Sequence, residues 1–182
     1  MQRMKSFVDT YFDFHYGVGF AIGLVIFFGY MFLLRRNKSQ GQSVSKKEIL
    51  CGLALSIYLI FLLGGTLLNR EVGNEYLIEW VPFWSYGDLY FEWNKSLAIQ
   101  IVYNVLVFIP WGILAPETFL KMRSIRWVIG SAVLFSFLIE VAQLIFKLGL
   151  FEFDDVFHNT LGALIGYAIW RVLALWRNRR KL

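Results

Sequence analysis

Five long apolar stretches constrain this chain more than any other feature of its sequence. They cover about residues 16–34, 49–69, 97–115, 126–148 and 155–176. A helix needs about 20 apolar residues to cross the roughly 30 Å apolar core of a bilayer, so each stretch is long enough to span a membrane. The sequence lacks the alternating ten-residue segments of a membrane β-barrel. We therefore predict an all-α, polytopic membrane bundle of five transmembrane helices.

Composition agrees with this class and excludes several others. Hydrophobic residues make up 58% and charged residues 17% of the 182 residues, against about 45–50% and about 25% in soluble domains. A single cysteine, Cys51, excludes a disulfide scaffold. The net charge of +5 is divided among several loops and is not gathered in one basic patch, so we expect no nucleic-acid partner.

The charges between the apolar stretches predict an orientation. Segments 35–48 and 116–126 and the C-terminal tail hold 13 Lys or Arg and 2 acids. The N-terminal tail and segments 70–96 and 147–155 hold 5 Lys or Arg and 10 acids. Because cytoplasmic loops are enriched in Lys and Arg, we predict that the N-terminus lies outside and the C-terminus inside.

The same pattern predicts three parts. Residues 1–48 form an accessory transmembrane helix with a polar cytoplasmic linker, residues 49–176 form a four-helix core, and residues 177–182 form a basic cytoplasmic tail. No internal repeat is visible, so an inverted-repeat transporter is not indicated.

The predicted outer loop, residues 70–96, carries an aromatic ring every few residues. Such rings favour the headgroup region of a bilayer, which suggests an interfacial anchor. The alternative is a half-buried platform that covers a site or touches a lipid-like ligand. Pro82 is expected to break any helix in this segment.

Polar side chains inside the apolar stretches are the main candidates for a site. Buried polar groups are costly in lipid and usually face a bundle interior or a cavity. A rise of about 1.5 Å per residue places these side chains in the outer half of the membrane, on helix faces that can converge. We predict that they line an outward-facing polar notch that binds a ligand, the residues being Asn104, Glu140, Gln143, Asp155 and Asn159.

Three of the polar residues could instead perform chemistry. Glu140, Asp155 and His158 are candidates for acid–base catalysis, and Asp154 lies beside them in the sequence. Binding is favoured over catalysis on a phosphate, because these polar residues include no lysine or arginine, and only Arg70 and Lys95 in the outer loop could hold one. An HExxH-type pattern is also missing, so we expect no metal site and no cofactor.

A further set of residues predicts close packing between helices. Gly162 and Gly166 form a small-xxx-small pattern that lets two helix backbones approach. Phe108 and Gly112 lie on one face of the 97–115 stretch, and Pro110 removes a backbone hydrogen bond there and is expected to kink that helix.

Several of these segments resemble the VanZ-like family of membrane proteins. Residues 104–112 read NVLVFIPWG, which is similar to the family's NxxxFxPxG segment, and residues 140–143 read EVAQ, similar to its ExxQ. Residues 154–166, DDVFHNTLGALIG, and residues 81–83, VPF, resemble two more family segments in the expected order. The resemblance covers roughly residues 49–170. Trp80 and His158 depart from the usual pattern.

The resemblance implies a multi-pass protein of the bacterial cell membrane. The namesake of the family is associated with low-level resistance to teicoplanin, a lipidated glycopeptide, and no catalytic residues can be carried over. We expect membrane lipids as partners, together with teicoplanin or a lipid-linked cell-wall precursor bound in the polar notch. The alternatives are a membrane-embedded enzyme acting on a lipid or lipid-linked phosphate, a lipid translocator, and a structural partner of another membrane protein. The sequence does not indicate an oligomeric state.

Overall fold

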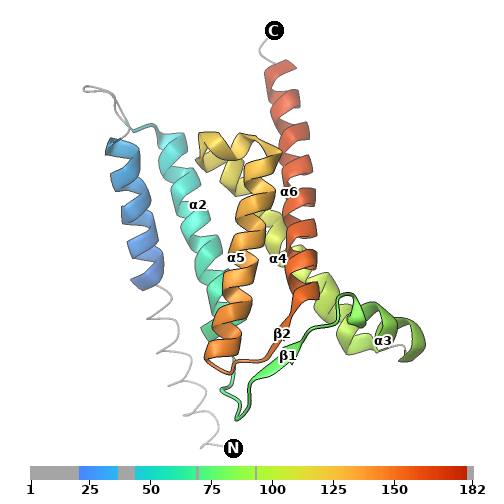
Figure 1. Cartoon of the computed structure of the whole chain (residues 1–182). Coiled ribbons are helices and arrows are strands. Elements are labelled where there is room, and N and C mark those ends of the chain that lie inside the picture. The colour runs from blue at the N-terminus through green and yellow to red at the C-terminus, as the bar shows by residue number, and fades with distance from the viewer. Residues whose placement is uncertain (1–20, 37–43, 69, 93, 180–182) are drawn as a thin grey trace, which may run out of the picture. The chain divides into compact units, whose positions relative to one another are not determined.

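The computed structural model describes residues 21–36, 44–68, 70–92 and 94–179. The chain divides into two compact units, Met1–Arg70 and Glu71–Leu182 (Figure 1). Both units are mainly helical, which confirms the predicted fold class at this coarse level.

The first unit is a pair of helices. Residues 21–36 are helical, and α2 runs over Lys46–Leu63 and continues into a π-helical turn, η1, over Gly64–Leu68. Ser45 begins α2 through a capping box with Glu48, in which each side chain bonds the other residue's backbone N–H. Gly52 lies directly against the ring of Tyr30. Part of the predicted 16–34 span lies outside the described residues.

The second unit is built around α6, which packs along both α4 and α5 (Figure 1). Asn94 begins α4 by accepting hydrogen bonds from two backbone N–H groups of the first turn. The element bounds, in chain order, are β1 Leu77–Glu79, α3 Trp84–Glu92, α4 Lys95–Thr118, η2 Leu120–Arg123, α5 Ile125–Ile145, β2 Leu150–Glu152 and α6 Phe153–Arg179.

Glycines bring α4 and α6 into backbone contact. A Cβ on Gly162 would lie 2.0 Å from the carbonyl oxygen of Val105, and one on Gly166 would lie 2.1 Å from that of Ile109. On the facing helix, a Cβ on Gly112 would lie 2.1 Å from the carbonyl oxygen of Ala163. Since the contacts advance in the same direction along both helices, α4 and α6 run parallel.

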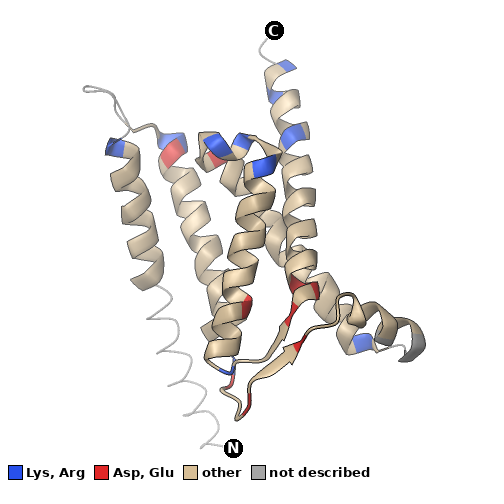
Figure 2. Ribbon diagram, in the orientation of Figure 1, with Lys and Arg blue, Asp and Glu red and all other residues tan. Residues whose placement is uncertain are grey.

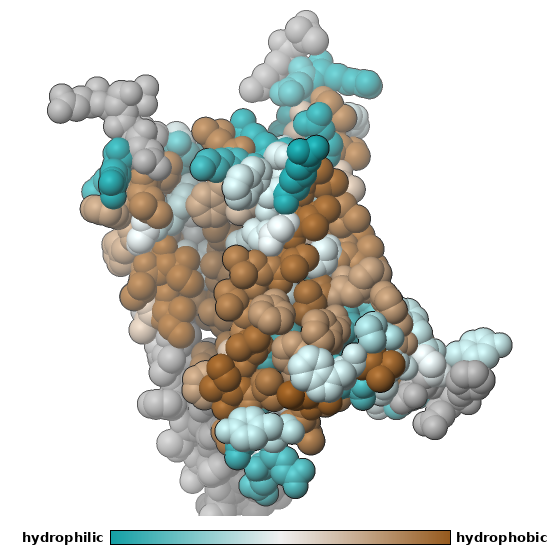
Figure 3. Space-filling model, viewed as in Figure 1, coloured by the Kyte–Doolittle hydropathy of each residue, from teal (hydrophilic) through white to brown (hydrophobic). Residues whose placement is uncertain are grey.

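Three helices among the described residues are long and apolar enough to cross a membrane: Lys46–Leu68, Lys95–Thr118 and Ile125–Ile145. Only 22–33% of the residues in their apolar windows are buried, so most of their apolar side chains face outward. Figure 3 shows this apolar surface over the middle of the α4–α5–α6 bundle. The helix α6 is longer than its predicted span, and it is not among these three, because polar residues occupy its first turns and basic residues its last.

Two features of the second unit were not predicted. The strands β1 and β2 pair in parallel, with Leu77 opposite Leu150 and Glu79 opposite Glu152. The predicted outer loop contains the helix α3, which begins just after Pro82. The fold is therefore mostly helical but not all-α, and a small sheet lies at one end of the bundle (Figure 1).

Charge separates along the second unit. Lys and Arg gather mainly at the end of the bundle where α5 begins and α6 finishes, whereas the acids lie mainly near β1 and β2 (Figure 2). We call these two ends the basic end and the strand end. At the basic end, Glu117 on α4 accepts a hydrogen bond from the Trp170 indole at 3.1 Å and forms an ion pair with Arg177 on α6.

Candidate functional site

A group of buried polar side chains lies at the strand end, between α5, β2 and α6. Each is at most 8% exposed. Those from α5 come from one face, at steps of four and three residues, and those from α6 from one face, at a step of four. The buried polar cluster consists of Ser136, Glu140, Gln143, Glu152, Asp155 and Asn159.

Hydrogen bonds join this cluster across elements. Glu140 accepts the backbone N–H of Glu152 at 3.1 Å, which ties α5 to β2. The Asn159 amide donates to the Ser136 hydroxyl at 2.7 Å, which ties α6 to α5. The Gln100 amide on α4 donates to the Glu152 carboxylate at 2.5 Å. Three helices and a strand are therefore connected through polar contacts in one small volume.

Two carboxyl groups of the cluster interact directly. Glu152 is 5% exposed and shares a hydrogen bond with Asp155. Burial, followed by the nearby charge of Asp155, raises the pKa of Glu152 to about 7, although the hydrogen bond from Gln100 opposes the shift. Glu152 is therefore partly protonated at neutral pH, as a general acid or a donor to a polar ligand would need to be.

The segment 77–86 closes over this region, and we call it the cap. Asp154, in the first turn of α6, holds it in place: its carboxylate accepts the backbone N–H of Phe83 at 2.6 Å and that of Ser85 at 3.2 Å. The Ser85 hydroxyl donates to the same carboxylate. Phe83 has a φ of 63°, which is strained for a residue with a side chain. The clamp by Asp154 offsets this strain and fixes the position at which α3 begins.

The cap also contacts His158. A hydrogen bond of 2.8 Å joins the Tyr86 hydroxyl and His158 Nε2, and His158 is only 1% exposed. Burial and the charge of Asp154 raise the pKa of the Tyr86 phenol. The sequence grouped His158 with Asp154 and Asp155 as possible acid–base partners. In the structure His158 bonds Tyr86, and Asp154 holds the cap and also lies close enough to His158 to interact with it electrostatically.

Some buried polar atoms have no hydrogen-bond partner among the described residues. They are Trp84 Nε1 in α3, Asn104 Nδ2 in α4, and His158 Nδ1 and Asn159 Oδ1 in α6. Most buried polar groups in proteins are paired, so several unpaired ones in one region call for an explanation.

The predicted ligand residues are therefore only partly brought together. Glu140, Gln143, Asp155 and Asn159 belong to the buried polar cluster, and Asn104 lies on α4, half-buried, one turn beyond Gln100. The structure buries the cluster beneath the cap and does not place it on an open surface. Within the residues that the structure describes, no group of three or more His, Cys, Asp or Glu has a geometry that could hold a metal ion.

The predicted packing residues lie deeper in the same bundle. Phe108 is fully buried, and Gly112, Gly162 and Gly166 form the α4–α6 contact described above. Pro110 lies within α4, which continues through it to Thr118.

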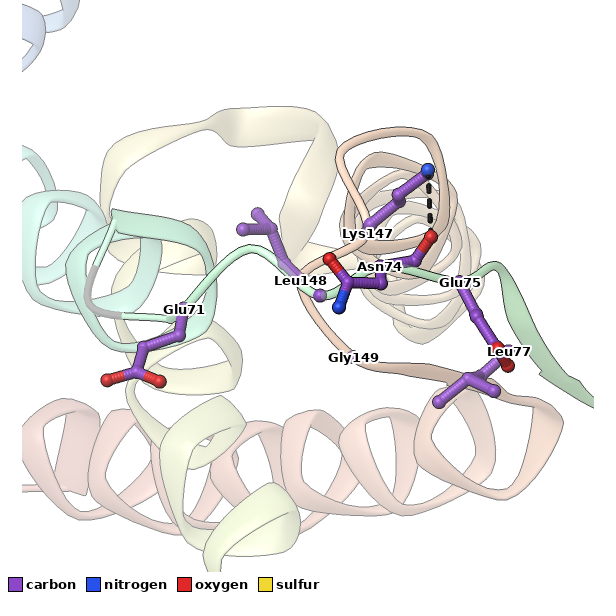
Figure 4. Close-up of a pocket in the computed structure, with 8 residues that line it drawn as sticks. Glu71, Asn74, Glu75, Leu77, Lys147, Leu148 and Gly149 are labelled. Atoms are coloured by element: carbon purple, nitrogen blue, oxygen red, sulfur yellow. Dashed lines mark hydrogen bonds between the residues drawn. The ribbon is translucent and has the colours of Figure 1, made fainter.

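An open recess lies where β1 and β2 begin, at the end of the two strands that is farther along the chain from α6 (Figure 4). It has a volume of about 380 Å³ and is formed by the segments that precede β1 and β2. Lys147 donates a hydrogen bond to the Asn74 carbonyl at 3.1 Å and lies 4.6 Å from the centre of the Tyr76 ring. None of the residues predicted as a site lines this recess, whose lining consists of Glu71, Gly73, Asn74, Glu75, Leu77, Lys147, Leu148 and Gly149.

Several functional candidates escaped the sequence analysis. Gln100 and Ser136 each lie four residues before a predicted site residue, Asn104 and Glu140, so helix periodicity could have found both. Glu152 was assigned to an outer loop, and nothing in its spacing indicated that β2 would bury it. Tyr86 and Ser85 depend on the fold of the cap, which has no periodic signal.

Fold and site together define a helical protein with helices able to span a membrane and with polar side chains buried at one end of its bundle. The sequence model of the VanZ/LLP1 family matches residues 21–175, and the chain belongs to that family. Protein VanZ of Enterococcus faecium is 30% identical over 83 residues, which are 46% of this chain and 51% of that protein. The match thus spans about half the length of that relative. No solved structure matches the chain.

Proposed function

We propose that this protein is a multi-pass protein of the bacterial cell membrane that contributes to resistance against teicoplanin-type glycopeptides. It does so by binding the lipidated antibiotic or a lipid-linked wall precursor at the strand end of its bundle. Family membership supports the link to resistance. The observation that carries the binding proposal is the buried polar cluster beneath a cap that displays aromatic side chains.

The cap suits a ligand that has both a polar head and an apolar tail. Trp80 is 65% exposed and Phe83 53% exposed, so rings are available to an acyl chain or to the bilayer surface. Two members of the cluster, Asp155 and Asn159, lie in the first turns of α6, the same turns to which Asp154 and His158 bind this segment. In this proposal the cap opens to admit the head of the ligand, while its tail stays among exposed rings and lipid.

The proposed topology has five transmembrane helices, with the N-terminus outside and the C-terminus inside. The separation of Lys and Arg from acids along the second unit supports this orientation (Figure 2). The proposed core spans residues 49–176, with residues 1–48 as an accessory helix and linker and residues 177–182 as a basic tail. Single cysteines introduced at Glu75 and Ser124, with Cys51→Ser, test this orientation. A membrane-impermeant thiol reagent should label the first from outside the cell and not the second.

Binding is tested with purified full-length protein in nanodiscs and with two labelled probes, teicoplanin and a lipid-linked wall precursor. We expect at least one probe to bind, and the variants Glu140→Gln and Asn159→Ala to weaken that binding about tenfold, the effect of one lost hydrogen bond of about 1.4 kcal/mol. Glu75→Gln, in the open recess, is the matched control. Weakening by Glu75→Gln alone would move the site to the recess, and the absence of binding by either probe would contradict the proposal.

A second candidate is a membrane-embedded enzyme that acts on a lipid or lipid-linked phosphate. The Tyr86–His158 hydrogen bond and the Glu152–Asp155 pair favour it, because imidazole and carboxyl groups are the ones that general acid–base catalysis uses most. Incubation of the protein with labelled lipid-linked phosphates should then give a product that His158→Gln abolishes while the protein remains folded. If the wild-type protein converts none of these lipids, this candidate is wrong.

A further inference from the structure

Two buried polar atoms without a hydrogen-bond partner lie on α4 and α6, two helices that pack together. The Asn104 amide offers a donor, Nδ2, and the Asn159 amide an acceptor, Oδ1, and neither has a partner among the described residues. The Asn159 side chain is 95% buried, since its exposed fraction is 5%. A buried polar atom without a partner destabilises the folded state, so a fold rarely keeps two of them without a reason.

Helix geometry places these atoms at one level of the interface. Gly162 on α6 contacts Val105 and Phe108 on α4, and the two helices run parallel. Asn104 precedes Val105 by one residue and Phe108 by four, and Asn159 precedes Gly162 by three. The donor and the acceptor are therefore at the same level, yet they do not bond each other.

A neighbouring contact holds the Asn159 side chain. The other end of the Asn159 amide is bound to the Ser136 hydroxyl at 2.7 Å. The adjacent His158 is held by Tyr86 through Nε2, and its second ring nitrogen, Nδ1, is also unpaired among the described residues. Asn159 and His158 thus present fixed, unused hydrogen-bonding atoms next to Asn104.

From this geometry we propose that Asn104, His158 and Asn159 bind an uncharged ligand group that both accepts and donates hydrogen bonds, such as an amide or a hydroxyl. Asn104 Nδ2 donates to the oxygen of this group, and the N–H or O–H of the group donates to Asn159 Oδ1. His158 Nδ1 serves as a third contact, since a neutral imidazole nitrogen can donate or accept. The inference rests on the proposed function and names the chemistry that the site recognises.

Charge distinguishes this group from a phosphate. The Asp155 carboxyl group lies one helical turn before Asn159, in the first turn of α6, and Glu152 lies just before α6 at the end of β2, so negative charge there repels an anion. A peptide amide or a sugar hydroxyl carries no such penalty. Both the glycopeptide and the lipid-linked precursor offer groups of this kind, so the two probes can be compared at the same site.

The test uses the variant Asn104→Leu in full-length protein reconstituted in nanodiscs, with labelled teicoplanin and labelled lipid-linked precursor as separate probes. We expect Asn104→Leu to weaken the binding of the active probe about tenfold and to leave Tm unchanged or raised, because the variant removes an unpaired buried donor. Asn159→Leu should weaken binding by a similar factor but also lower Tm, since Ser136 loses its partner. Thr160→Val is the control, because the Thr160 hydroxyl bonds only the backbone of its own helix.

The outcomes separate this inference from the proposed function. Wild-type affinity in Asn104→Leu would show that the amide does not bind the ligand, and a lower Tm of that variant would show that the amide stabilises the fold; either result would overturn the inference alone. If the wild-type protein binds neither probe, the proposed function is overturned, and the Tm of Asn104→Leu still decides the inference. An unchanged or higher Tm then supports a site for a different ligand, and a lower one excludes the site.

Discussion

The two halves of the α4–α6 pair use opposite ways of packing. Towards the basic end, Gly162 and Gly166 bring the two backbones into contact, and no side chain can enter between them. Towards the strand end, Gln100 on α4 bonds Glu152 just before α6 begins, and Asn104 on α4 and Asn159 on α6 each have a buried polar atom without a partner among the described residues. The half with the glycines holds the two helices in close contact. The polar half contains hydrogen-bonding atoms that have no partner among the described residues. A tightly packed half can offset the cost of a polar half, which is a common arrangement at functional sites.

The largest effect is expected from a substitution that disrupts the glycine contacts between α4 and α6. Gly162→Ala places a Cβ 2.0 Å from the carbonyl oxygen of Val105, and backbone on both sides must move. We expect a loss of about 3 kcal/mol in the free energy of unfolding, or roughly 10 °C in Tm, measured by thermal unfolding in detergent. Gly130→Ala on α5 is the control, because nothing lies within 4 Å of its added Cβ. Equal Tm values for the two variants would mean that the helices do not meet at this glycine.

The second largest effect is expected from a substitution that loosens the cap at the strand end and leaves the helices unchanged. Asp154→Asn replaces an ionised acceptor of two backbone N–H groups and a hydroxyl by a side chain that can accept at one atom only. We expect the cap to lose about 2 kcal/mol of local stability, so the amides of residues 83–86 should exchange with solvent about 30-fold faster.

Glu79→Gln provides the control for this change. Glu79 also accepts a backbone N–H, that of Val81 at 2.9 Å, but the contact is exposed and local, and glutamine can still make it. Its amide exchange should stay close to that of the wild-type protein. Unchanged exchange in Asp154→Asn would show that other contacts hold the cap.

The smallest effect concerns pH. Because the pKa of Glu152 is raised to about 7, the folded protein keeps a proton that the unfolded chain releases near its ordinary, lower pKa. Stability from this group is thus largest at low pH and is lost as pH rises through about 7. We expect Tm to fall by a few degrees as pH rises from 4.5 to about 7. The variant Glu152→Gln should remove this contribution to the dependence of Tm on pH. A slope that persists unchanged in the variant would assign the titration to another group.

The sequence predicted the helices better than the site. Long apolar stretches require helices, and Gly162 and Gly166 repeat at a spacing that a helix brings to one face. Glu140 and Gln143 were found because a polar side chain is conspicuous in an apolar stretch. The structure places both in the buried polar cluster.

What escaped prediction depends on contacts between distant segments. The strands β1 and β2 are three residues each, too short for any periodic pattern, and their pairing buries Glu152. The role of Asp154 follows from the way in which residues 83–85 return to the start of α6. Local sequence carries no information about such a return, so the cap and the burial beneath it could not be foreseen.

The parallel pairing of β1 with β2 has a consequence for the order of folding. Leu77 and Leu150 are 73 residues apart, and α3, α4 and α5 all lie between them. Closing so long a loop costs conformational entropy that two three-residue strands repay poorly by themselves. The pairing should therefore form only after the intervening helices have assembled, and it should be the first contact to dissociate when the native protein fluctuates. Entry of a ligand would then require only the reversal of the last folding step.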